Sequence, residues 1–336
     1  MKPITLRATP RVTQRTLLAL ACLVAAAGAH AQSADRYPTR PVRMVIPFAP
    51  GGASDFVGRI LQPKLSEELG EQVVADNRAG AAGNIGVELA ARANPDGYTM
   101  LLGNVGTMAI NPSVFPKFPV RPLRDLIGVT LVVDVPGAMA VHASVPVATV
   151  QEFINYAKAR PGKLNYGSAG AGSAQRLAFE YFMDKAGINI VHIPYKGGAG
   201  PSTTALLSGE VAASMVTVVS FIPHLKSGKV KVLAVIAPNR VPQLPDTPTM
   251  AESGFPELRL GSWQGVAVPT GTPPAILNRL YSAIMKTMSD PETVRRLAMG
   301  GVNVATSKSP QEYAGFLRTQ TEFWAKLVKQ TGAAAE

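Results

Sequence analysis

Short apolar runs rich in valine and isoleucine alternate with helical patterns along this chain. Such alternation is typical of βαβ units and predicts an α/β fold with mainly parallel sheets. Between the runs, the segment Phe56–Leu69 places its apolar residues on one helical face. The predicted strands are Val42–Phe48, Gln72–Asp76, Tyr98–Leu102, Val129–Val133, Ala138–His142, Ile190–Ile193, Val230–Ile236 and Gly265–Val268.

The N-terminal segment has the three parts of a secretory signal peptide. It begins with basic residues and no acid, continues with the apolar run Leu17–Ala27, and ends on Ala29-His30-Ala31. That run is too short to span a bilayer. We therefore expect residues 1–31 to be removed and the protein to act outside the cytoplasm. The only cysteine, Cys22, lies inside the run, which favours an ordinary signal residue over a lipid anchor and leaves no thiol chemistry.

The mature chain is long enough for two domains, since about 305 of the 336 residues remain after the leader. No linker separates two consecutive domains, so we expect the chain to leave one lobe, build a second and return. Residues 32–132 together with 237–336 would form lobe 1, and residues 133–236 lobe 2. Leu131–Val133 and Leu233–Ile236 are the predicted crossing strands, and the ligand cleft is expected between the lobes.

Charge and composition argue against nucleic-acid binding and against a metal or cofactor site. The formal net charge is +11, of which four positive charges lie in the leader. This excess suits a small anionic partner, but the chain lacks the dense basic run of nucleic-acid-binding proteins. The remaining histidines, His142, His192 and His224, are scattered, so neither a metal site nor a cofactor is predicted.

One local sequence pattern occurs twice: a strand is followed by a Gly/Ser-rich turn and then by an amphipathic helix. The two copies are Val45–Phe56 and Asn165–Leu177. Such a turn leaves backbone N–H groups free at a helix start, where the helix dipole also favours negative charge. Two turns facing one another would form a cradle for a small anion. The chain offers no comparable set of catalytic groups, so the sequence favours a binding protein.

At the first turn, Gly51 and Gly52 permit positive φ and close approach of the backbone, and Ser54 or Asp55 can cap the helix. For Asp55, a cap and a contact with the ligand remain equal alternatives. The candidate binding residues at this turn are Phe48, Gly51, Gly52, Ala53, Ser54 and Asp55.

At the second turn, Ser168 and Ser173 supply hydroxyl donors. A dinucleotide fingerprint is disfavoured because Gln175 occupies the third glycine position, and neither serine lies in a G-x-S-x-G elbow. Arg176 is either an exposed helix residue without a role or a cation in the cleft that favours a second carboxylate. The candidates here are Ser168, Gly172, Ser173, Ala174 and Arg176.

Further candidates lie outside the two turns. Tyr195, at the end of a strand, can supply a hydroxyl group or an aromatic wall, and Thr107 is a hydroxyl donor from lobe 1. Trp263 is interpreted as packing at the lobe junction, with a place in the pocket wall as the alternative.

A series of motifs runs in order from about Tyr37 to the C-terminus. They are Tyr37–Arg43, Pro47–Asp55, Asn77–Gly86, Asn94–Thr99, Pro161–Ser168, His192–Gly198, Leu244–Thr249 and Ser262–Gly265. No single motif is decisive, but their combination resembles the Bug family of periplasmic solute receptors. That family is related to TctC, the substrate-binding component of tripartite tricarboxylate transporters.

The resemblance implies a type II bilobal binding-protein fold, with two α/β lobes joined by two crossing strands. It also implies a small carboxylate ligand held by turn amides, hydroxyl groups and ordered water. This chain departs from the family at Arg176, where His is common, and at Val216 and Thr217, where Asp is frequent. Thr217 is therefore a candidate site residue, and the missing acid favours a purely anionic carboxylate over an amino acid.

The prediction is a monomeric periplasmic receptor for a small di-, tri- or aromatic carboxylate. It would deliver this ligand to membrane subunits of a tripartite tricarboxylate-type transporter, without enzyme activity or a nucleic-acid partner. Two alternatives stay open. One is an exported serine hydrolase that uses Ser168 or Ser173, and the other is a sensor that presents its closed form to a membrane kinase.

Overall fold

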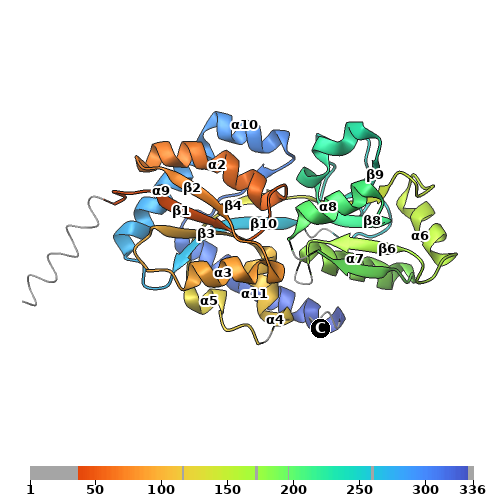
Figure 1. The fold of residues 1–336 in the computed structure, drawn as a ribbon, viewed down its shortest axis with the longest axis horizontal. Coiled ribbons are helices and arrows are strands. Elements are labelled where there is room, and N and C mark those ends of the chain that lie inside the picture. Colours follow the sequence, from red (N-terminus) through yellow and green to blue (C-terminus); the bar gives the residue numbers. More distant parts are fainter. Residues whose placement is uncertain (1–36, 116, 171–172, 196, 259–260, 332–336) are drawn as a thin grey trace, which may run out of the picture.

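The computed structural model describes residues 37–331, apart from residues 116, 171–172, 196 and 259–260. Two β-sheets lie next to each other along the long axis of the molecule, and helices cover both faces of each sheet (Figure 1). We call the first sheet with its helices lobe 1 and the second lobe 2. This arrangement confirms the predicted bilobal α/β class. Within the described residues, no helix is both long and apolar enough to cross a membrane.

Lobe 1 contains a sheet with the strand order β11-β4-β10-β3-β1-β2. Its strands are β1 (Val42–Ile46), β2 (Val73–Asn77), β3 (Thr99–Asn104), β4 (Leu126–Val135), β10 (Ser262–Pro269) and β11 (Asn303–Val304). One face packs on α2 (Ala53–Leu69), α9 (Pro274–Ser289) and α10 (Pro291–Met299). The other face packs on α3 (Asn84–Ala91), η2 (Gly106–Ile110), α4 (Asn111–Val114) and α11 (Pro310–Thr331). The short elements η1 (Ala81–Gly83) and α5 (Pro122–Asp125) complete the lobe.

Lobe 2 contains a sheet with the strand order β7-β6-β8-β5-β9. Its strands are β5 (Gly137–His142), β6 (Asn165–Ser168), β7 (Val191–Pro194), β8 (Ala213–Thr217) and β9 (Val230–Ile236). Helices α6 (Val150–Lys158) and α7 (Ala174–Ala186) bury one face. Helix α8 (Ala199–Ser208), with the short η3 (Val218–Ser220) and η4 (Ile222–Ser227), covers the other.

Both sheets are mixed, which corrects the prediction of mainly parallel sheets. The pairs β1–β2, β1–β3, β6–β7 and β6–β8 are parallel. Antiparallel pairing occurs around β10 in lobe 1 and around β5 in lobe 2. The reason is the route of the chain. Strand β4 leads toward lobe 2 and β10 returns from it, so these neighbours run in opposite directions.

The chain passes between the two sheets at Pro136, between β4 and β5, and again in the segment between β9 and β10. The predicted crossing strands Leu131–Val133 and Leu233–Ile236 do not make the passages, because each pairs within a single sheet. The division at residues 132/133 and 236/237 lies close to these passages and stays a prediction.

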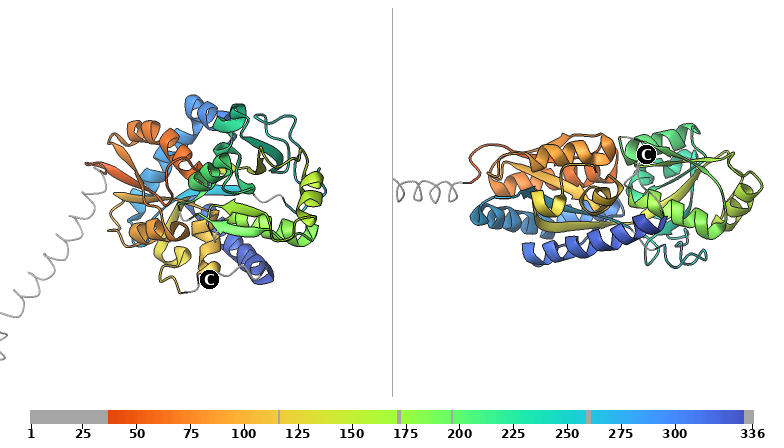
Figure 2. Two further views of the ribbon diagram at one scale, coloured as in Figure 1. Left: turned by 45° about the vertical axis from the view of Figure 1, so that its right-hand side comes forward. Right: turned by 90° about the horizontal axis from the view of Figure 1, so that it is seen from below.

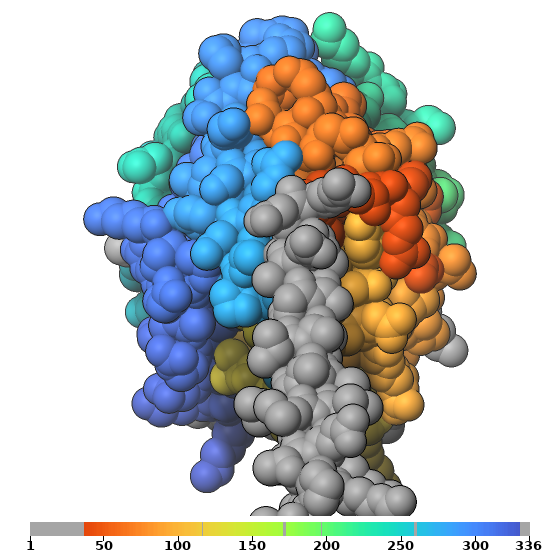
Figure 3. Space-filling model, turned by 90° about the vertical axis from the view of Figure 1, so that its left-hand side faces the viewer, coloured from red at the N-terminus to blue at the C-terminus, as the bar shows by residue number. Residues whose placement is uncertain are grey.

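Helix α2 illustrates how the sequence pattern builds the core. Ile60, Leu61, Leu65 and Leu69 are buried against the sheet, and Phe56 packs beside them, which confirms the predicted apolar face. At the end of lobe 1, the orange N-terminal segments lie beside the blue C-terminal ones (Figure 3). The lobe is therefore built from both ends of the described chain.

The lobes touch one another at several points. The backbone N–H of Ala49 in lobe 1 donates to the carbonyl oxygen of Gly197 in lobe 2 (3.0 Å). Helix α11 extends from lobe 1 beneath lobe 2, where Trp324 joins a core cluster with Ala174 and Leu177 at the start of α7 (Figure 2). The side-chain amide of Gln243 donates to the carbonyl oxygen of Ala298. These contacts describe a closed arrangement.

Close packing between β10 and α11 generates a prediction about stability. A Cβ on Gly265 would overlap the hydroxyl group of Tyr313 and lie 2.8 Å from the carbonyl oxygen of Thr130. We expect Gly265→Ala to lower the free energy of unfolding by at least about 1–3 kcal/mol, because the buried neighbours cannot move freely. Urea denaturation of the purified protein measures this loss.

Tyr313→Phe provides the companion variant. The Tyr313 hydroxyl group is buried and has no hydrogen-bond partner among the described residues, so its removal should be neutral or stabilising. In Gly265→Ala the same removal should restore part of the lost stability. Equal stability of Gly265→Ala and the unaltered protein would contradict the packing.

Candidate functional site

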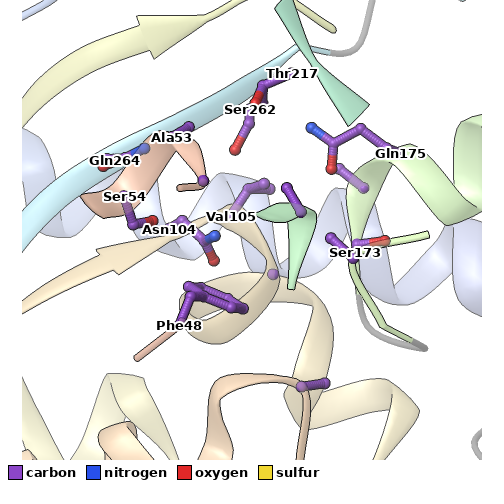
Figure 4. A pocket seen from close by; sticks show the side chains of 16 residues that line it. Phe48, Ala53, Ser54, Asn104, Val105, Ser173, Gln175, Thr217, Ser262 and Gln264 are labelled. Atoms are coloured by element: carbon purple, nitrogen blue, oxygen red, sulfur yellow. The ribbon is translucent and has the colours of Figure 1, made fainter. Parts of the chain in front are cut away.

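A cavity of about 40 Å³ lies where the two lobes meet. Lobe 1 contributes the start of α2, the segment after β3 and the start of β10, whereas lobe 2 contributes the starts of α7 and α8 and the end of β8 (Figure 4). None of the lining residues in the described part of the chain is charged. The lining consists of Phe48, Gly52, Ala53, Ser54, Ala82, Asn104, Val105, Gly106, Ala169, Ser173, Ala174, Gln175, Ala199, Thr217, Ser262 and Gln264.

Helix N-termini converge on this cavity. Helices α2, α7 and α8 begin there after Gly52, Ser173 and Gly198, and a fourth helical segment begins at Val105. Among the described residues, no side chain caps α2 or α8. First-turn N–H groups have no acceptor within their own helix, and each helix start carries about half a positive charge. Donors and positive potential therefore surround the cavity, an arrangement that suits an anion.

The turn before α2 is fixed by Asp55. Its carboxylate accepts the backbone N–H of Gly51 (3.2 Å) and pairs with Arg59, with 2.9 Å between Oδ1 and Nε. Gly51 has φ +89°, a conformation that glycine adopts readily. Asp55 is not part of the cavity lining. Its carboxylate does not cap α2 itself but holds the turn before the helix, where Gly52 and Ser54 line the cavity.

The two serines of the second turn have different surroundings. Ser173 lines the cavity and caps α7, where its Oγ accepts the backbone N–H of Arg176 (3.1 Å). Because that bond uses a lone pair, the hydroxyl proton remains available for a ligand. Ser168 is fully buried outside the lining, where its Oγ accepts the N–H of Gly170 (3.2 Å) and lies 2.7 Å from Nε2 of His192. Ser168 thus shapes the turn.

Behind this turn lies a cluster of titratable groups. The ring of His192 stacks on Tyr166 at a centroid distance of 4.9 Å, and the Tyr166 hydroxyl group donates to Glu180 (2.8 Å). Arg176 lies 3.5 Å from the same carboxylate. Burial, followed by the positive charge of Arg176, lowers the pKa of His192 to about 4. Arg176 therefore faces Glu180 inside lobe 2. This placement does not support the hypothesis that Arg176 binds a second carboxylate of the ligand.

Asn104 is an amide of the lining that the sequence analysis did not single out. Its backbone N–H donates to the Thr107 hydroxyl oxygen (3.0 Å), and its Oδ1 accepts the backbone N–H of Thr107 (3.0 Å). Thr107 itself is buried outside the lining. Its observed role is to orient Asn104, which leaves the Asn104 Nδ2 group for the cavity.

Two glutamines of the lining carry buried polar atoms without a partner among the described residues. Gln264 is fully buried and neither Nε2 nor Oε1 is paired, and Gln175 has an unpaired Nε2. Gln264 lies in the motif Ser262–Gly265, which carries part of the family resemblance. Gln264 itself was not named as a candidate from the sequence. An unpaired buried amide costs about 1–3 kcal/mol, so these groups point to a polar guest.

The loop before α3 closes one side of the cavity. Ala81 and Ala82 have φ values of +46° and +56°, which non-glycine residues rarely adopt. Nδ2 of Asn111 donates to the carbonyl oxygen of Ala82 (3.0 Å) and holds this conformation. A Cβ on Gly170 would lie 3.4 Å from that of Ala82, so the loop reaches the second turn across the lobes.

The candidate residues divide into two groups. Those that line the cavity are Phe48, Gly52, Ala53, Ser54, Ser173, Ala174 and Thr217. Those that lie elsewhere are Gly51, Asp55, Thr107, Ser168, Arg176 and Tyr195. The Tyr195 hydroxyl group donates to Glu210 (2.8 Å) beside a separate surface groove. Gly172 lies outside the described residues, and within those residues no cluster of His, Cys, Asp and Glu could hold a metal ion.

Comparison with known proteins yields consistent relatives. A family model described as "Tripartite tricarboxylate transporter family receptor" matches residues 57–333. The protein BugT of Bordetella pertussis is 36% identical over 95% of this chain and 98% of its own. Rpa4515 of R. palustris, solved with adipate, has a TM-score of 0.84 and 33% identity, covering 88% of this chain and 98% of its own. MatC from Rhodopseudomonas palustris, solved with bound malate, has a TM-score of 0.82 and 30% identity, covering 87% and 100%.

The environment of His192 generates a prediction about pH. Its folded pKa of about 4 lies below the ordinary 6.5, so between these values the unfolded chain binds a proton and the folded protein does not. Its contribution to stability is complete above about pH 6.5 and falls by on the order of 1–3 kcal/mol as the pH drops toward 4. The unaltered protein should therefore lose more stability than His192→Gln between pH 7 and pH 4.5 in urea titrations. Parallel profiles would exclude this protonation.

Proposed function

Because the chain belongs to the receptor family of tripartite tricarboxylate transporters, we propose that it binds a small organic carboxylate in the periplasm and delivers it to a transporter of that type. The observation that carries the proposal is the convergence of helix N-termini on a cavity whose described lining mixes polar and apolar residues and carries no charge. A buried carboxylate needs hydrogen-bond donors, and these helix starts supply them from the backbone.

The ligand class follows from the lining and from the relatives. Two relatives were solved with adipate and malate, which are both small carboxylates. Phe48 and Val105 add apolar surface to the wall of the cavity. Because adipate and malate are both aliphatic, we favour a small aliphatic acid over an aromatic one. An amino acid is disfavoured, since the described lining offers no acid to pair with an ammonium group.

Closure of the two lobes is the proposed mechanism. The starts of α2 and of the segment at Val105 belong to lobe 1, whereas those of α7 and α8 belong to lobe 2. A carboxylate that bridges them gains its full set of donors only when the lobes are together. The ligand therefore stabilises the closed state through contacts that the open state lacks.

Export is the remaining part of the proposal. The basic start, the apolar run Leu17–Ala27 and the Ala29-His30-Ala31 signal support removal of residues 1–31 and a periplasmic location. These residues lie outside the described part of the chain. The N-terminal sequence of protein recovered from a periplasmic extract tests the cleavage site.

The proposal is tested by binding and by turnover together. Native mass spectrometry of freshly purified protein detects a co-purified acid, and calorimetry with malate, succinate and adipate measures affinity. Binding without chemical change supports the receptor, and failure of every carboxylate to bind would overturn it. Capture of membrane proteins with and without ligand separates delivery to a transporter from signalling through a kinase.

One observation bears on the hydrolase alternative: the Ser168 Oγ lies 2.7 Å from Nε2 of His192. However, Ser168 is fully buried, and the same oxygen atom is bonded to the turn through Gly170. Steady hydrolysis of p-nitrophenyl esters that disappears in Ser168→Ala would establish the hydrolase. We expect no turnover.

Ser173→Ala tests the second turn. The variant removes a hydroxyl donor of the cavity, and we expect the affinity for malate or another bound acid to fall by roughly 1–3 kcal/mol. It also removes the cap of α7, which costs about 1 kcal/mol of stability. Thr149→Ala is the matched control, because Thr149 caps α6 away from the cavity. The control should lose similar stability but no affinity, and equal affinity in all three proteins would remove Ser173 from the site.

Gly200→Ala tests closure. A Cβ at Gly200 on α8 would lie 2.6 Å from the carbonyl oxygen of Pro50 across the two lobes, so the lobes cannot close fully. We expect affinity to fall about tenfold or more with no loss of melting temperature, since alanine favours a helix. Gly315→Ala on α11 is the control, because its nearest atom is a side-chain nitrogen of Arg318 at 3.8 Å. Undiminished binding by Gly200→Ala would contradict the closed arrangement as the bound state.

A further inference from the structure

Two amides of lobe 1 stand opposite one another in the cavity wall. Gln264 on β10 is the register partner of Asn104 on β3 in an antiparallel pair, so both side chains project from the same face of the sheet. Both residues belong to the cavity lining. In Figure 4, Gln264 lies beside Ala53 and Ser54 at the start of α2, with Asn104 below it. The pair therefore adjoins the helix starts that are proposed to hold a carboxylate.

Asn104 and Gln264 offer different hydrogen-bonding atoms to the cavity. Thr107 already occupies Oδ1 of Asn104, so the Asn104 amide presents a donor. Gln264 is fully buried, and its donor and its acceptor are both without a partner among the described residues. A carboxylate has only acceptors, so it can satisfy the two NH₂ groups but not the Gln264 Oε1 atom. A ligand that carries a donor of its own would pair with that oxygen directly.

Charge decides which donor this is. An ammonium group would enter a region of positive potential from the helix starts, and the described lining offers no anion to pair with it. A hydroxyl group is neutral, donates one hydrogen bond and accepts others, so it complements Gln264 and Asn104 together. We infer that Gln264 and Asn104 form a subsite for a hydroxyl group, and that the ligand is a small aliphatic hydroxycarboxylate. This inference rests on the proposed carboxylate receptor and names its ligand class.

A matched series of acids tests the subsite by calorimetry. The probes are butanoate, 2-hydroxybutanoate, 3-hydroxybutanoate and 2-aminobutanoate, together with butanedioate and its 2-hydroxy derivative. We expect 2-hydroxybutanoate or 3-hydroxybutanoate to bind about tenfold or more tightly than butanoate. The 2-hydroxy derivative of butanedioate should likewise bind about tenfold or more tightly than butanedioate. In each case the deoxy acid leaves Oε1 of Gln264 unpaired. The amino acid should bind more weakly than the deoxy acid.

Gln264→Met assigns the preference to one side chain. Methionine keeps the length of the side chain but removes its polar atoms, so the hydroxy acid should lose its advantage over its deoxy counterpart. The melting temperature should stay the same or rise, since two unpaired buried atoms are lost. Gln151→Met on α6 is the matched control, because this exposed residue lies outside the cavity lining, and it should retain the preference for the hydroxyl group. A purely structural role would instead lower the melting temperature and weaken all acids equally.

The outcomes distinguish a failure of the proposed receptor from a failure of the hydroxyl subsite. If no acid of the series binds, the carboxylate receptor itself is overturned. If the acids bind but hydroxy and deoxy forms do so equally, the receptor stands and the hydroxyl subsite is wrong. Retention of the preference in Gln264→Met, or its loss in Gln151→Met, would also overturn the assignment to Gln264.

Discussion

A buried anion needs compensating donors, and in this molecule the donors come from the backbone. Helix starts from both lobes point at one small cavity, and their N–H groups and dipoles would serve the proposed carboxylate in place of basic side chains. This arrangement constrains the rest of the fold. Strands of both sheets must end near the cavity, and each must turn into a helix within a few residues. Glycines at these turns, such as Gly51, allow the backbone to approach closely.

Local sequence predicted the parts of this architecture that depend on near neighbours. The apolar face of α2 and most strands follow from the spacing of apolar residues, and the two Gly/Ser-rich turns lead to helix starts that line the cavity. Strand β8, in contrast, was not predicted. Its residues Ala213–Thr217 are all buried, but they are mostly small or polar and carry no alternating pattern. The mixed pairing of the sheets was missed because it depends on the route of the chain between the lobes.

Side-chain roles were harder to predict because partners far apart in sequence decide them. Ser168 and Arg176 were candidates on the strength of their turn, but His192 and Glu180 engage them inside lobe 2. Asn104 and Gln264, in contrast, meet only through the pairing of β3 with β10, which joins segments that are 160 residues apart in number and that no local motif connects. A turn can thus be recognised from its own residues, whereas the residue opposite it requires the fold.

Charged side chains near the cavity are paired away from it. Asp55 binds Arg59 on one side, and Arg176 lies against Glu180 on the other, so neither carboxylate opposes an anion in the cavity. Charge binding and ligand discrimination would therefore depend on different groups, which has a consequence for specificity. In the proposed receptor, binding of the negative charge depends on backbone N–H groups that every substitution except proline leaves in place, and discrimination falls to neutral side chains of the wall. A single change at a position such as Gln264 can then alter which ligand is preferred without disturbing the helix starts that hold its carboxylate.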